Sequence, residues 1–267
     1  CALSFVLAAS LREHPLALLA AALLIFAYVT LDNLDGAQAR RIGRSTRLGE
    51  FLDHWLDTLN NGFVVLGACF AAGLPSSFIL CVLCAATLAF FAVQWELRQT
   101  GVFRMGRLAD VEGNTSVALL YVALAVLGSD FFQARPIAGG PSLAVWLGCG
   151  VAGQALWTLI SAVRRVPAQR GAFLPIGLAH TALLAWAATG ALPSASYLPI
   201  AFFLNPVFTA GPVLSRLLGL DTSRLDWGVV VLLAAGAVTT GAGLPTSSSE
   251  ALGLFSVVAL AGLTARH

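Results

Sequence analysis

Long apolar runs recur along almost the whole chain, and they limit its fold more than any other feature. The runs reach roughly 18 to 24 residues, close to the number that a helix needs to cross the hydrocarbon core of a bilayer. The composition agrees, because 58% of the 267 residues are hydrophobic, 10% are charged and the mean hydropathy is +0.85. These values argue against a soluble domain and predict an all-α, polytopic bundle of transmembrane helices.

Polar and Gly/Pro-rich breaks divide the chain into about ten expected spans. The expected spans are residues 1–10, 16–31, 49–73, 77–97, 114–133, 143–162, 172–192, 196–219, 227–243 and 251–265. The first is too short to cross a membrane, and the chain begins with Cys1 rather than Met, so we expect a span that is incomplete here. No repeat and no long linker separates the spans, which predicts a single membrane domain over residues 1–267.

The arginines predict the orientation of the bundle. The chain has no lysine, so its 15 basic residues are all arginines. If the loop after the second span is cytoplasmic and the spans alternate, only Arg12 and Arg135 lie outside and the other 13 lie inside. Cytoplasmic loops carry such an excess of positive charge.

Four aspartates stand at the cytoplasmic edge that this orientation predicts. Asp32 and Asp35 end the second span, and Asp53 and Asp57 begin the third, so each pair shares a helix face. Gathered carboxylates repel one another unless a cation lies between them. A set of oxygen ligands favours Mg²⁺, Mn²⁺ or Ca²⁺. The alternative interpretation is a charged loop at the membrane interface.

Small residues and an arginine accompany the aspartates. Gly36, Ala39 and Gly49 remove side-chain bulk beside them, which lets a ligand approach the backbone. Arg40 supplies a guanidinium group suited to phosphate oxygens. Together these residues are typical of a phosphoryl-transfer or pyrophosphate-binding site. An ion-coupled transporter is a remote alternative, since it would place its carboxylates near the midplane and show an internal repeat.

The spacing of residues 32–57, D-x2-D-G-x2-A-R-x8-G-x3-D-x3-D, resembles the signature of the CDP-alcohol phosphotransferase family. The stretches QARR, LGE and Asp53-His54 resemble its choline/ethanolamine phosphotransferase branch, and residues 94–114 resemble that branch loosely. The family commonly has a Pro-Asn followed by Thr in its first span, and we expect that motif before Cys1. Beyond residue 115 the likeness is one of hydropathy only.

The resemblance implies transfer of a phospho-alcohol from a CDP-linked donor to a hydroxyl, with release of CMP. It implies two Mg²⁺ or Mn²⁺ ions held by the four aspartates at the cytoplasmic membrane edge. The residues that it places around the nucleotide and phosphates are Asp32, Gly36, Ala39, Arg40 and Gly49.

The base that takes the proton from the acceptor hydroxyl has two candidates. Asp57 is the residue usually assigned in the family. His54, oriented by Glu50 about one turn away, is the second, because an imidazole titrates near neutral pH. We favour His54 because it and Glu50 both match the diacylglycerol-accepting branch that the sequence resembles. His54 as a polar residue that never titrates remains the alternative.

The acceptor and the source are predicted less directly. The LGE and DH residues favour a diacylglycerol-like acceptor with CDP-choline or CDP-ethanolamine. The lysine-free composition instead favours a bacterial inner membrane, where a CDP-diacylglycerol donor reacts with a soluble alcohol of the inositol, glycerol phosphate or serine type. We expect membrane lipids and no nucleic acid as partners, leave a homodimer open, and expect Asn205-Pro206 to kink the eighth span.

Overall fold

The computed structural model describes residues 1–43, 46–104, 110–166, 170–190, 192–219 and 223–241. Every regular element in these ranges is helical, which confirms the all-α prediction. The α-helices are α1 (Ala2–Ser10), α2 (Pro15–Arg41), α3 (Arg47–Ala71), α4 (Ser76–Thr100), α5 (Asp110–Leu127), α6 (Ser129–Gln133), α7 (Leu143–Arg165), α8 (Phe173–Ala188), α9 (Ser194–Leu218) and α10 (Ser223–Gly241). A short 3₁₀ turn, η1 (Arg170–Ala172), precedes α8.

Four of the described helices are long and apolar enough to cross a membrane: α2, α4, α7 and α9. Shorter apolar helices lie within α5, α8 and α10, and α1 has only 9 residues. The last expected span, residues 251–265, lies outside the described residues. A membrane-embedded helical protein is therefore supported, and the number of ten spans stays a prediction.

The expected span over residues 114–133 is wrong in its extent. Helix α5 ends at Leu127, Gly128 adopts φ +79°, and the separate helix α6 begins at Ser129. Glycine reaches this left-handed region without a steric penalty, so it ends the helix inside an apolar stretch. Hydropathy alone does not register this break, because Phe131 and Phe132 continue the apolar pattern.

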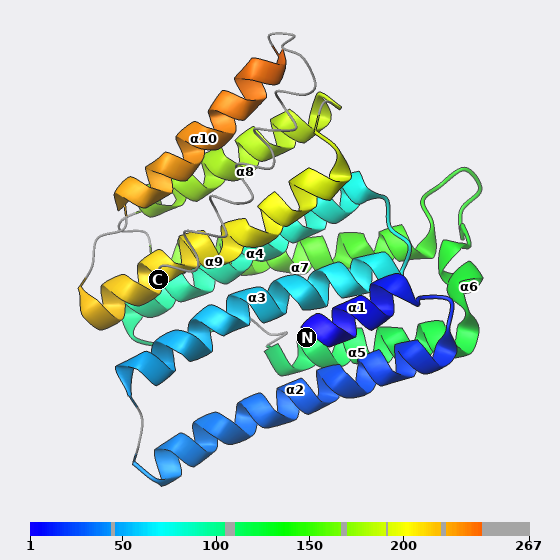
Figure 1. Cartoon of the computed structure of the whole chain (residues 1–267), viewed down its shortest axis with the longest axis horizontal. Helices are drawn as coiled ribbons and strands as arrows, with labels where there is room; N and C mark the ends of the chain where they lie inside the picture. Colours follow the sequence, from blue (N-terminus) through cyan, green and yellow to red (C-terminus); the bar gives the residue numbers. More distant parts are fainter. Residues whose placement is uncertain (44–45, 105–109, 167–169, 191, 220–222, 242–267) are drawn as a thin grey trace.

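The helices lie side by side with roughly aligned axes (Figure 1). Helices α8 and α10 pack together along one edge of the bundle, and α2 and α5 pack together along the opposite edge. Helix α4 lies between α7 and α9 and buries most of its side chains, as does α9. Helix α3 packs against α1 and α9, so it lies between the edge that contains α2 and the centre.

Helix α3 begins at a capped turn only a few residues after α2 ends. The hydroxyl of Thr46 accepts a hydrogen bond from the backbone N–H of Gly49 at 3.0 Å, which caps the start of α3. Ion pairs between α3 and the end of α9, and between the ends of α4 and α7, place these ends on one side of the bundle. The described structure therefore gathers the predicted site residues at this side.

Candidate active site

Three of the four predicted aspartates converge. Asp32 of α2 and Asp53 and Asp57 of α3 each offer one carboxylate oxygen, and these three atoms lie within 4.8 Å of one another. Two ligands on opposite sides of a Mg²⁺ ion, at about 2.1 Å each, are about 4.2 Å apart. A shift of well under an ångström would therefore let all three bind one ion, and an oxygen-only set suits Mg²⁺ or Mn²⁺.

Asp35 stands outside this group of three, exposed on α2, and its role as a ligand stays a prediction. Its charge nevertheless acts on Asp53, which lies in the polar first turns of α3, outside the four helices that qualify as spans. Burial raises the pKa of Asp53; His54 opposes the rise, and the negative charges of Asp35 and Glu50 add to it. Converging negative charge of this kind is what a bound cation relieves.

Tyr28 joins α2 to the carboxylate group. Its hydroxyl donates a hydrogen bond to Oδ1 of Asp57 at 2.9 Å. Such partners fix the orientation of a metal ligand and raise metal affinity. Sequence analysis missed Tyr28, although it precedes Asp32 by four residues and so shares its helix face.

His54 and Glu50 have different partners from those that the sequence predicted. Nδ1 of His54 lies 3.4 Å from Nε2 of Gln94 on α4, and its ring centroid lies 5.6 Å from that of Phe103. Oε1 of Glu50 accepts a hydrogen bond from Nη2 of Arg216 on α9. The structure thus orients His54 through Gln94, while Glu50 belongs to an ion pair. The role of His54 as the base stays a prediction, and Gln94, a polar residue inside an apolar run, was the missed signal.

The residues predicted around the nucleotide are placed by the last turns of α2 and the first turn of α3. Gly36 and Ala39 are half-buried and follow Asp32 by four and seven residues, so they continue its face. A Cβ at Gly49 would lie 3.1 Å from Oγ1 of Thr46, so glycine fits the helix cap here. The side chain of Arg40 lies outside the described residues. Contact of these residues with a nucleotide stays a prediction.

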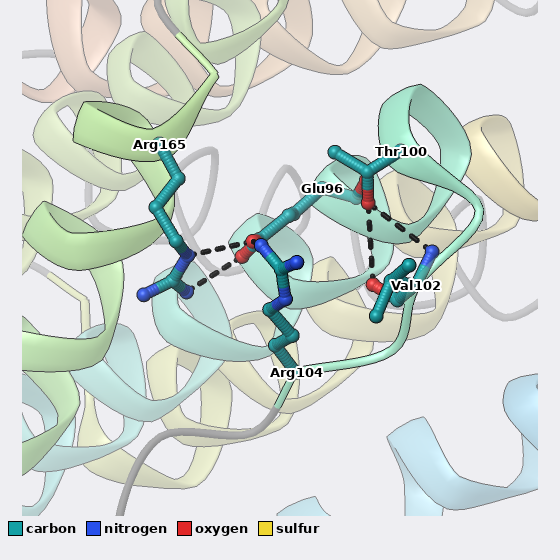
Figure 2. A network of polar contacts seen from close by, with 5 residues as sticks. All are labelled: Glu96, Thr100, Val102, Arg104 and Arg165. Atoms are coloured by element: carbon teal, nitrogen blue, oxygen red, sulfur yellow. Dashed lines mark hydrogen bonds and ion pairs between the residues drawn. The ribbon is translucent and has the colours of Figure 1, made fainter.

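The buried carboxylate of Glu96 anchors the segment that lies beside His54. The side chain of Glu96 is 0% exposed and accepts hydrogen bonds from Nε and Nη2 of Arg165, both at 2.6 Å. Nη1 of Arg104 lies 3.6 Å from the same carboxylate, and the hydroxyl of Thr100 donates to the backbone carbonyl of Glu96 (Figure 2). These contacts tie the segment after α4 to the bundle, and this segment carries Phe103 to the His54 ring.

A cavity of about 500 Å³ lies along α3. On α3 it is lined by Asn61, which follows Asp57 by four residues, and further on by Val65 and Ala68 of the same face. Helices α4, α5 and α7 provide the other walls, which are mostly apolar, with Gln154 among the polar exceptions. Its size and lining are typical of a site for an apolar small molecule.

Comparison with known proteins identifies relatives of this sequence. A family model described as CDP-alcohol phosphatidyltransferase matches residues 1–154, more than half of the chain. The chain is 31% identical to cholinephosphotransferase 1 of Danio rerio over 140 residues, which are 51% of this chain and 36% of that protein. It is 34% identical to cholinephosphotransferase 1 of Gallus gallus over 112 residues (40% and 33%) and 33% identical to that of Homo sapiens over 115 residues (42% and 28%).

The matched region spans about a third of the length of these relatives. The similarity supports the predicted choline/ethanolamine branch. All three relatives come from vertebrates, so they give no support to the predicted bacterial inner membrane.

Proposed function

Since the chain belongs to the CDP-alcohol phosphatidyltransferase family, we propose that it transfers a phosphocholine- or phosphoethanolamine-type group in phospholipid synthesis. The donor is the CDP-linked alcohol, the acceptor is the hydroxyl of a diacylglycerol-like lipid, and CMP is released. The observation that carries this proposal is the convergence of Asp32, Asp53 and Asp57 from two helices. The names of the cholinephosphotransferase relatives support the choice of head group.

Asp32, Asp53 and Asp57, with Asp35 beside them, would hold one or two Mg²⁺ or Mn²⁺ ions. When bound, such ions supply positive charge to the donor phosphates and to the leaving CMP. Oxygen ligands without sulfur or imidazole suit these hard ions. Gly36, Ala39, Arg40 and Gly49 are the residues that we assign to the nucleotide and phosphates.

Tyr28, His54 and Phe103 have roles other than holding the metal or the nucleotide. Tyr28 keeps the Asp57 carboxylate oriented toward the other two aspartates. His54, with Nδ1 beside Gln94, takes the proton of the acceptor hydroxyl; Asp57 is the alternative base. Phe103 covers one side of the imidazole.

The cavity supports a substrate with hydrocarbon chains. It begins one turn beyond Asp57, so a hydroxyl held at the carboxylates would leave the chains of the same molecule in apolar surroundings. Removing apolar surface from water favours this placement by about 25 cal/mol per Å². A diacylglycerol acceptor has such chains, and so does the CDP-diacylglycerol donor of the alternative reaction with a soluble alcohol.

A substrate assay separates these two reactions. The purified protein is incubated with labelled CDP-choline or CDP-ethanolamine, with and without diacylglycerol, in the presence of Mg²⁺ or Mn²⁺. We expect labelled phospholipid only when diacylglycerol is present. Product formed from CDP-diacylglycerol with inositol, glycerol phosphate or serine, and none from the CDP-alcohols, would replace this proposal by the alternative.

A further inference from the structure

Helix α9 contacts helix α3, which carries Asp53 and Asp57, at several levels, and no step of the proposed function uses α9. Helix α9 begins at Ser194, beyond residue 154 where the family match ends. It packs along α3 and buries most of its own side chains. We name Phe202, Asn205 and Arg216 the α9 contacts, because each reaches α3.

Asn205 makes the contact nearest to the aspartates. Its side chain is 2% exposed, and its Nδ2 donates a hydrogen bond to the backbone carbonyl of Thr58 at 3.1 Å. The hydroxyl of Thr209 donates to Oδ1 of Asn205 at 3.0 Å, which holds the amide in place. Thr58 directly follows Asp57, so this bond fixes the backbone beside a predicted metal ligand. Few competing partners exist in buried surroundings, where such a bond restrains one helix against another.

Phe202 sets the distance between the two helices one turn further along α3. A Cβ at Gly62 would lie 2.6 Å from the Phe202 ring, so glycine lets the ring pack directly on the α3 backbone. Phe202 and Asn205 are three residues apart and share one face of α9.

Arg216 makes the contact at the start of α3. Its Nη2 lies 2.5 Å from Oε1 of Glu50, and its side chain is 23% exposed. A small apolar cluster of Phe51 with Val213 and Leu214 lies next to this ion pair. The first turn of α3 is therefore held by charge and by packing together.

Two of the α9 contacts, those to Thr58 and Gly62, lie away from the carboxylate face of α3. At about 100° per residue, Thr58 lies about 100° to 140° and Gly62 about 140° to 180° away from Asp53 and Asp57, whereas Glu50 lies within about 60° of both. A small rotation or shift of α3 would move both aspartates relative to Asp32, which α2 holds. A misplacement of about 1 Å in such a site lowers activity by about 10²-fold.

We infer that Asn205 and Arg216 are positioning residues that hold Asp53 and Asp57 in register with Asp32 for cation binding. This inference rests on the proposed function for the metal site. It extends the machinery of the reaction to a helix outside the segment that the family model matches.

The test measures Mn²⁺ binding to the full chain in detergent without substrates, by the electron paramagnetic resonance signal of free Mn²⁺. We expect Asn205→Leu and Arg216→Met to weaken Mn²⁺ binding by about 10- to 100-fold, the range found for residues that orient metal ligands. The Mn²⁺ dependence of transfer should shift in parallel. Arg216→Lys, which keeps the cation, should restore most of the affinity.

Two matched controls remove similar groups elsewhere. Thr87→Val removes a buried hydroxyl that bonds only to Leu83 of its own helix, and Arg164→Met removes an exposed arginine at the end of α7. Both should keep the wild-type Mn²⁺ affinity, which separates positioning from a general loss of stability.

The outcomes distinguish this inference from the proposed function. Wild-type Mn²⁺ affinity in Arg216→Met and in Asn205→Leu would overturn the inference and leave the function standing. If Asn205→Leu does not fold, the two arginine variants provide the test. Equal Mn²⁺ affinities of Arg216→Met and Arg216→Lys would then overturn the inference. A wild-type protein that neither binds Mn²⁺ nor transfers a phospho-alcohol would overturn both.

Discussion

The aspartates are not equivalent in their surroundings. Asp57 accepts a hydrogen bond from Tyr28, whereas Asp53 lies near the charges of Asp35 and Glu50, which help to raise its pKa. A cation at the centre of the group would favour ionisation of Asp53, because it neutralises the charges that oppose this ionisation. Its loss should be felt first in metal binding.

We predict that Asp53→Asn lowers transfer by at least about 10²-fold, because the lost metal clamp supplies several kcal/mol of charge stabilisation. Asp35→Asn should act likewise if two ions are bound. Turnover is measured at saturating Mg²⁺ or Mn²⁺. Asp130→Asn, an exposed carboxylate on α6, is the control and should keep wild-type turnover. Near-normal turnover of Asp53→Asn would contradict the site.

We predict that His54→Ala lowers kcat by about 10² to 10⁴, the usual contribution of a general base. Gln94→Leu should lower kcat less, because it removes only the contact that orients the ring. Binding of the CDP-alcohol, measured by calorimetry, should stay nearly unchanged in both. Wild-type rates from both variants would leave Asp57 as the base.

At the scale of elements, the ends of α4 and α7 are joined by a pair of unequal exposure. Glu96 is 0% exposed, whereas the side chain of Arg165 is 34% exposed and reaches water. An unpaired charge that is buried destabilises a protein far more than an unpaired charge that is partly exposed to water. The two residues of this pair should therefore respond differently to removal.

We predict that Arg165→Met lowers the free energy of unfolding more than Glu96→Gln does. Breaking a buried ion pair costs about 3 to 5 kcal/mol; we expect about 2 to 3 kcal/mol for Arg165→Met, because Arg104 stays near the carboxylate and Arg165 is partly hydrated. Glu96→Gln leaves Arg165 without its partner, but this side chain can reorient toward water. The decrease in the free energy of unfolding should therefore be smaller for Glu96→Gln. The midpoints of thermal unfolding in one detergent test this order, and equal midpoints would refute it.

At the scale of the whole molecule, four helices line the cavity, and one of them, α3, also carries Asp53 and Asp57. Two glycines of helix α7 allow the role of the cavity to be tested. Gly150 lines the cavity, Gly153 does not, and a Cβ at either glycine meets no atom within 4 Å. A large side chain can thus be placed inside or outside the cavity on the same helix.

We predict that Gly150→Trp lowers kcat/KM for the lipid substrate by about 10-fold or more, because the indole occupies space that the hydrocarbon chains need; excluding even one methylene group loses about 1 to 3 kcal/mol. Affinity for Mn²⁺ and CMP should not change. Gly153→Trp is the control. Equal lipid kinetics of the two variants would show that the cavity holds no substrate chain.

The sequence by itself determined the helical class, and it predicted that four aspartates converge where α2 and α3 meet, of which the structure brings three together. These features depend on local periodicity and on a short connection, and a single chain displays both. Its spacing also placed the chain in its family, with the match to residues 1–154 as confirmation. The number of spans and the homodimer stay predictions.

Only the tertiary structure decided which side chains support these residues. Glu50 pairs with Arg216, 166 residues away, where the sequence had predicted a Glu50–His54 contact. Asn205 bonds to the backbone of Thr58, 147 residues away, a contact that the sequence did not predict. Helix α9 continues through Pro206, and the kink expected there stays a prediction. Contacts between distant helices depend on the packing of whole faces, and local spacing carries no record of which faces meet.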